Sequence, residues 1–74
     1  MGVRLVFLGR LADLVGADSR EVAPGALPAV LGGLPDGLLG PRVKLALNGM
    51  LVGAEGLMLA EGDELAFLPP VSGG

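Results

Sequence analysis

Residues 61–74 read Glu-Gly-Asp-Glu-Leu-Ala-Phe-Leu-Pro-Pro-Val-Ser-Gly-Gly, and this ending contains both a strand and the reason why the strand stops. Apolar residues alternate along residues 64–68, which predicts a β-strand with Leu65 and Phe67 facing inward. The two prolines that follow lack a backbone donor and have φ fixed near −65°, so the sheet cannot continue through them. We therefore expect the chain to leave the sheet as a stiff, extended segment.

This segment forms a predicted C-terminal tail that carries no large side chain. Six extended residues span at most about 20 Å, and glycine fits into slots too narrow for other residues. Glycine is abundant in this chain, 14 of 74 residues, so a final pair by itself is a weak signal. Its position four residues beyond a strand, after two prolines, favours a tail that enters another protein. The tail residues are Pro69, Pro70, Val71, Ser72, Gly73 and Gly74.

Composition excludes several classes of function. The chain has 74 residues, enough for one domain, and it contains neither Cys nor His. The usual zinc ligands and the Ser-His and Cys-His nucleophile pairs are therefore missing. The net charge is −3, the five basic residues are scattered, and only two residues are aromatic, so we expect no nucleic-acid partner. We also expect no cofactor bound by this chain.

No stretch of the sequence predicts a membrane segment. The longest run without a charge covers residues 22–35, which is shorter than the roughly 20 apolar residues of a spanning helix. The first residues show no signal-peptide pattern. The sequence therefore predicts a soluble, cytoplasmic protein without a membrane partner.

The rest of the chain predicts short elements joined by tight turns. A helical turn at residues 10–15 should end at Gly16, and the main helix should occupy residues 26–34 and start near Leu27, because Pro28 fits only a first turn. The glycine pair at residues 32–33 should end that helix within about two turns. Residues 53–60 are expected to form a loop or a helical turn. Further strands are predicted at residues 3–8, 20–23, 43–47 and 50–52, the last two joined by an Asn48-Gly49 hairpin turn.

The order strand, strand, helix, strand, strand, strand predicts an α+β fold. The first and last strands should lie parallel in the middle of a mixed sheet of about five strands, since the helix provides the crossover. This arrangement is the ubiquitin-like β-grasp, with the main helix packed on one face. We assign residues 1–68 to the β-grasp domain and residues 69–74 to the tail.

The opposite face of this sheet is a predicted partner-binding surface. It should be apolar in the middle and bordered by charge, a combination that often marks a protein interface. The alternative is scattered apolar surface, which every protein has. The predicted residues are Arg4, Val6, Leu8, Lys44, Ala46, Ala66 and Leu68.

The reactive group that remains is the terminal carboxylate of Gly74. An unactivated carboxylate is a poor acyl donor, because its leaving group would be oxide. Adenylation by ATP makes AMP the leaving group, after which a sulfur or nitrogen nucleophile can attack. The ATP must be held by another protein, so this chain would supply only the substrate.

The sequence resembles the small subunit of molybdopterin synthase. That family ends in a Gly-Asp-Glu strand followed by Phe-x-Pro-Pro-Val-Ser/Thr-Gly-Gly, as residues 62–74 do, and residues 3–8 and 11–16 resemble its first strand and turn. The segment 26–40 is shorter and richer in Gly and Pro than the family's usual helix.

The resemblance implies a sulfur carrier without catalytic side chains of its own. An adenylyltransferase of the ubiquitin-activating type would adenylate Gly74, and a persulfide sulfur donor would convert it to a thiocarboxylate. The tail would then enter the large synthase subunit, which carries the catalytic residues. There the sulfur would pass to cyclic pyranopterin monophosphate, within a heterotetramer of two small and two large subunits.

Two other functions remain open. A related sulfur carrier would serve thiazole synthesis or tRNA thiolation, although such relatives less often have the two prolines. A ubiquitin-like tag would join lysines through an isopeptide bond. The chain has a single lysine, Lys44, and would therefore be a poor builder of chains linked to itself.

Overall fold

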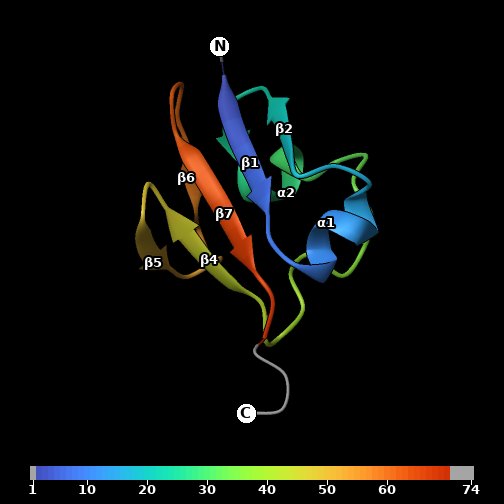
Figure 1. The fold of residues 1–74 in the computed structure, drawn as a ribbon. Coiled ribbons are helices and arrows are strands. Elements are labelled where there is room, and N and C mark those ends of the chain that lie inside the picture. The colour runs from blue at the N-terminus through green and yellow to red at the C-terminus, as the bar shows by residue number, and fades with distance from the viewer. Residues whose placement is uncertain (1, 71–74) are drawn as a thin grey trace.

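The computed structural model describes residues 2–70 and has the α+β architecture expected from the sequence (Figure 1). Strands outnumber helices, and both helices are short. The elements in chain order are β1 (Val3–Phe7), α1 (Arg10–Val15), β2 (Ser19–Val22), β3 (Gly25–Ala26), α2 (Leu27–Val30), β4 (Lys44–Leu47), β5 (Met50–Val52), β6 (Met58–Leu59) and β7 (Glu64–Leu68).

The main sheet has five strands in the order β2-β1-β7-β4-β5. Strand β7 lies at its centre, parallel to β1 on one side and antiparallel to β4 on the other. The predicted pairing of the first and last strands is therefore confirmed. Because β7 is hydrogen-bonded on both sides, its direction sets the point at which the chain leaves the sheet.

One face of the main sheet supports the hydrophobic core. The alternation in β1 and β7 has the predicted phase, with Leu5, Leu65 and Phe67 fully buried. The rings of Phe7 and Phe67 are stacked, with centroids 5.3 Å apart and planes inclined by 25°. Such aromatic pairs add about 0.5–1.5 kcal/mol beyond the area that they bury. The complete core is Val3, Leu5, Phe7, Leu11, Leu27, Val30, Leu38, Leu45, Leu59, Leu65 and Phe67.

Helix α2 is shorter than expected. It begins at Leu27, with Pro28 in the first turn as predicted, but it ends at Val30 after four residues. Gly32 and Gly33 follow within a turn, so the backbone entropy of glycine opposes further helix. Leu27 and Val30 are buried, and beyond the helix Leu31 and Leu34 still pack against the core. The apolar spacing of residues 27–34 therefore reaches the core, although only its first half is helical.

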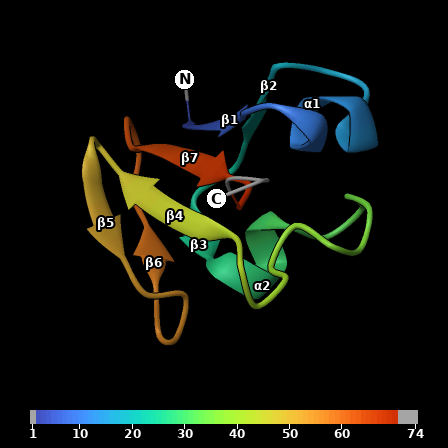
Figure 2. The same cartoon turned by 60° about the horizontal axis from the view of Figure 1, so that its bottom comes forward.

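A second, two-stranded sheet lies beneath the main one. Strand β3 pairs antiparallel with β6, so that Ala26 lies opposite Met58 and Gly25 opposite Leu59. The predicted loop at residues 53–60 therefore contains a short strand, and Leu59 within it is buried. In Figure 2, α2 and this small sheet lie together on one side of the main sheet. They cover the face that carries the core.

The turn between β4 and β5 has the predicted geometry. Asn48 and Gly49 have φ values of 51° and 87°, as a type I′ turn requires. This turn also connects β4 to the start of β7: the Glu64 amide donates to the Asn48 side-chain oxygen at 2.9 Å, and the Asn48 side-chain amide donates to Asp63 at 3.0 Å. The hairpin turn is thus held to the central strand by polar contacts.

Candidate functional site

The tail begins where the central strand is packed most firmly. Phe67 is buried beneath the sheet, and its carbonyl accepts a hydrogen bond from the Leu8 amide at 3.2 Å. Leu68 is the last residue of β7, and Pro69 and Pro70 follow it, both partly buried. The predicted end of the strand is therefore confirmed at Leu68. In Figure 1 this end of β7 lies beside the beginning of β4.

Gly9 shapes the surroundings of the first tail residue. Its φ of 57° and ψ of −134° define a conformation that is available almost only to glycine. A Cβ atom at this position would lie 3.1 Å from Cγ of Pro69. Gly9 thus allows the chain to turn from β1 into α1 while Pro69 packs against it. Sequence reasoning missed this contact, because nothing in the sequence relates residue 9 to residue 69.

The residues predicted for a partner surface lie on one face of the sheet, and the strand register arranges them in rows. Val6 lies opposite Ala66, which lies opposite Ala46, so these three apolar side chains form the middle row across β1, β7 and β4. All three are partly buried. Because the neighbouring residues Leu5, Leu45 and Leu65 face the core, this row lies on the opposite face of the sheet, the side away from α2. We call this surface the outer face.

The two ends of the outer face differ in character. Nearest the tail, Leu68 lies opposite Lys44, and Leu8, 42% exposed, follows β1 next to it. At the far end Arg4 lies opposite Glu64 on one side and Glu21 on the other. All seven residues predicted for a partner surface therefore share this face, and its apolar part reaches the root of the tail.

Leu51 extends the apolar row and was not predicted. It lies opposite Ala46 and is 62% exposed, more than any of the predicted apolar residues. A two-residue turn at 48–49 pairs residue 47 with 50 and residue 46 with 51. The hairpin signal in the sequence therefore contained the information needed to place Leu51 on the outer face.

Two hollows flank the root of the tail, and Pro70 lines both. One, of about 770 Å³, lies along β4 and β5 and is bordered by Lys44 and Leu51. The other, of about 670 Å³, lies against α1 and is bordered by Arg10 and Asp13. Residues 40–43, Arg42 among them, line both hollows. The surface around Pro70 is therefore concave and largely apolar, and most of its charged residues are basic.

The remaining predicted tail residues, Val71, Ser72, Gly73 and Gly74, lie outside the described residues, so their predicted role stays a prediction. In the described part of the chain, residues 2–70, no group of three or more His, Cys, Asp or Glu side chains is arranged to hold a metal ion. No helix within that part is long and apolar enough to cross a membrane.

One ionisable group in the described chain has a clearly shifted pKa. The Ala60 amide donates to the Asp63 carboxylate at 2.8 Å, and the Asn48 side chain also donates to it. These two hydrogen bonds lower the pKa of Asp63 below its ordinary value of 3.8. This carboxylate lies at the start of β7, at the opposite end from the tail, so its role is structural.

Comparison with known families agrees with this geometry. Residues 5–74 match the ThiS family, a span that includes most of the sheet and the predicted tail. A search of curated proteins found no match.

Two of the solved structures that this chain resembles are archaeal proteins. The crystal structure of SAMP1 from Haloferax volcanii is 31% identical, covers 97% of this chain and 98% of its own, and superposes with a TM-score of 0.72. The solution structure of the small archaeal modifier protein 1 from Methanosarcina acetivorans is 23% identical, covers 97% and 95%, and has a TM-score of 0.70. The second likeness concerns the fold alone.

Proposed function

We infer the function from the family, because this chain belongs to the ThiS family of ubiquitin-like sulfur carriers. Proteins of this family work with an activating enzyme and with a partner enzyme. From this premise we propose that Gly74 is the sulfur-bearing residue and that residues 69–74 act as a tail distinct from the domain at 1–68.

The proposed chemistry takes place on the terminal carboxylate of Gly74. A ubiquitin-activating-type adenylyltransferase transfers AMP from ATP to the carboxylate and releases pyrophosphate. A persulfide sulfur then attacks the acyl carbon, AMP leaves, and reduction of the resulting acyl disulfide by a thiol releases the thiocarboxylate. The chain's own contribution is to present an unhindered carbonyl, because glycine has no side chain to block the attack.

We further propose that the sulfur acceptor is cyclic pyranopterin monophosphate, and that this cytoplasmic chain acts as the small subunit of molybdopterin synthase. The observation that carries this proposal is the ending of β7 at Leu68, directly before two prolines and beside an apolar outer face. A large subunit that covers Val6, Ala66 and Leu68 would receive the tail in its active site. Catalytic side chains would then belong to that subunit.

Reconstitution tests this proposal. The chain is incubated with the activating enzyme, ATP and a persulfide donor, and its intact mass is measured. We expect the mass to increase by the difference between sulfur and oxygen, and the product to form molybdopterin when the large subunit and cyclic pyranopterin monophosphate are added. Thiocarboxylate that forms but is not consumed by the large subunit would contradict the molybdopterin assignment and favour thiazole synthesis or tRNA thiolation.

A second candidate function is protein tagging. The similarity to SAMP1, a small archaeal modifier protein, favours it. In this case the adenylated Gly74 would be attacked by a lysine amine of another protein to form an isopeptide bond. Both functions require the same activation of Gly74, and they differ in the nucleophile that follows. Covalent adducts in which the Gly74 carbonyl is joined to a lysine amine of another protein would support tagging.

A further inference from the structure

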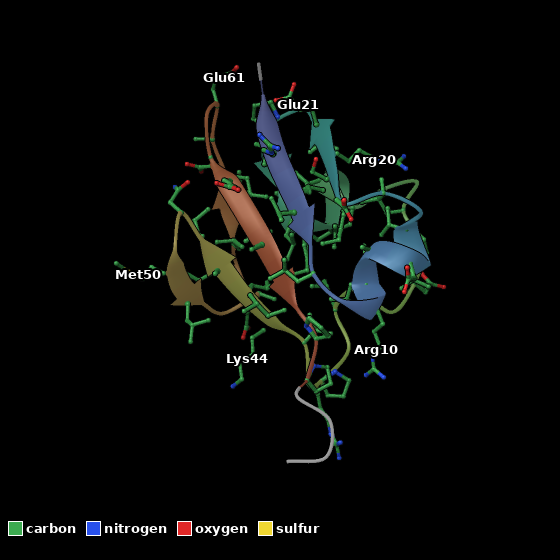
Figure 3. The ribbon with its side chains drawn as sticks, in the orientation of Figure 1. Arg10, Arg20, Glu21, Lys44, Met50 and Glu61 are labelled. Carbon is green, nitrogen blue, oxygen red and sulfur yellow. The ribbon has the colours of Figure 1, made fainter. Side chains whose placement is uncertain are left out.

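The basic residues of this chain are distributed unevenly with respect to the tail. Three of the five, Arg10, Arg42 and Lys44, line the two hollows that meet at Pro70. Figure 3 shows Arg10 and Lys44 at the tail end of the molecule, whereas Glu21 and Glu61 lie at the other end. A protein of net charge −3 therefore presents a positive region around the root of its tail.

These three cations are not neutralised within the structure. All three are exposed, and none makes a side-chain hydrogen bond or ion pair with another residue in the range 2–70. Among the described residues that line the hollows, Asp13 contributes the one carboxylate. Since the acidic residues Glu61 and Glu64 lie at the other end of β7, the molecule is electrically polarised along that strand.

The position of the three cations indicates that they act on docking and not on the chemical step. Four residues follow Pro70, and in an extended chain they span about 13 Å. The positive charges are therefore too far from Gly74 to act on the reacting carbonyl when the tail is extended. They lie where the body of the domain would meet the entrance of a channel that receives the tail. Charges at the border of an interface act mainly on association and orientation.

We propose that Arg10, Arg42 and Lys44 form a basic collar that docks against an acidic rim at the entrance to the tail channel of the activating enzyme. Attraction at the tail end and repulsion at the acidic end orient the domain tail first. This inference rests on the proposed function, because it requires an enzyme that receives the tail. It adds to that function the inference that the activating enzyme carries carboxylates around the entrance of the channel.

The test compares two charge reversals of the same kind. Arg42→Glu changes the collar residue that lines both hollows, and Arg20→Glu changes an exposed arginine on β2, away from the tail (Figure 3). The rate of ATP–pyrophosphate exchange by the activating enzyme is measured against the concentration of each protein. Circular dichroism verifies that both variants are folded.

We expect Arg42→Glu to raise KM about tenfold at low ionic strength with kcat unchanged, and Arg20→Glu to change KM much less. In about 1 M salt, where charges are screened beyond about 3 Å, the wild type and Arg42→Glu should give similar KM values. Equal KM values for the wild type and Arg42→Glu at low salt, or equal effects of both reversals, would overturn the collar while leaving the proposed function intact. A wild-type protein that supports no exchange at all would overturn the proposed function and the collar with it.

Discussion

The first residue of β7 is held by polar groups, whereas the last residue, Leu68, directly follows the buried Phe67, whose ring stacks on that of Phe7. The Glu64 end is joined to the β4–β5 turn through Asn48, and Asp63 next to it accepts hydrogen bonds from Asn48 and Ala60. The Leu68 end follows the buried Phe67 ring, and hollows and exposed cations surround it. The Glu64 end is fixed by hydrogen bonds. The Leu68 end is packed on the core side of the sheet, and the surface around it is accessible to solvent.

The contrast between these two ends indicates how a small domain could present the proposed tail without a large core. A central strand paired on both sides cannot rotate or slide unless several backbone hydrogen bonds break. The polar contacts at one end fix its register, and the aromatic pair fixes the point where Pro69 leaves the sheet. We therefore expect changes at Leu68 and beyond to affect function, and changes at Phe67 or Asp63 to affect stability.

The largest effect is expected beyond the tail end of β7. Deletion of Gly74 moves the terminal carboxylate back by about 3.5 Å, and such a misplacement of a reacting group costs about a hundredfold or more in rate. The free energy of unfolding should stay unchanged, since the core lies in residues 3–67. Adenylation is measured by pyrophosphate exchange and stability by a urea melt. A deletion variant that is adenylated at the wild-type rate would show that Gly74 is not the activated residue.

The next largest effect is on stability. Phe67→Ala removes one ring of the stacked pair at a fully buried position and should lower the free energy of unfolding by about 3–5 kcal/mol. Phe67→Leu keeps more of the volume and should cost less. Both are measured by urea denaturation. A loss below about 1 kcal/mol for Phe67→Ala would mean that the end of β7 is not anchored by this pair.

A smaller effect is expected on partner binding. Leu68→Asp places a charge on the outer face next to the tail and should weaken binding of the partner enzyme about tenfold or more. Met58→Asp is the matched control, because Met58 is 65% exposed but lies on β6, in the small sheet beneath the main one. Affinity is measured by calorimetry, and a thermal melt shows whether either variant is unfolded. Equal affinities for both variants would exclude the outer face as the binding surface.

The smallest expected effect is on the pH dependence of stability, through Asp63 at the start of β7. Hydrogen bonds to the charged form lower the pKa of Asp63, so the folded state binds this proton less readily than the unfolded state. The resulting stability is present above pH 3.8 and is lost as the pH falls through the folded-state pKa. Asp63→Asn should therefore lower the melting temperature by a few degrees at pH 7 and by less in acid. Asp36→Asn, at an exposed loop position, is the control. A difference from wild type that does not vary with pH would contradict this account.

Much of the fold was predictable because local signals and tertiary structure agree. Alternation in β1 and β7, the stop at Pro69 and the Asn48-Gly49 turn together determine which face of each strand is buried. The two-residue strands β3 and β6 were missed, since so short a pairing has no period to detect. The length of α2 was overestimated, because its apolar spacing continues past Val30 while the glycines do not support a helix.

In the candidate site, too, some features could be predicted from the sequence and others could not. The seven predicted residues of the outer face follow from strand alternation, and Leu51 follows from the register of the turn. The collar depends on residues 10, 42 and 44 coming together around Pro70, and the loop that carries residue 42 has no periodic pattern. In the sequence these cations are merely scattered. Only the tertiary structure brings them to one end.

The central claim, that Gly74 is activated and carries sulfur, is tested most directly by the intact mass of the protein purified from its own cells. The claim predicts a form heavier than the unmodified chain by the difference between sulfur and oxygen, located in the C-terminal peptide and absent when the activating enzyme is deleted. Protein that carries only an unmodified carboxylate, or that occurs only in isopeptide linkage to other proteins, would contradict it.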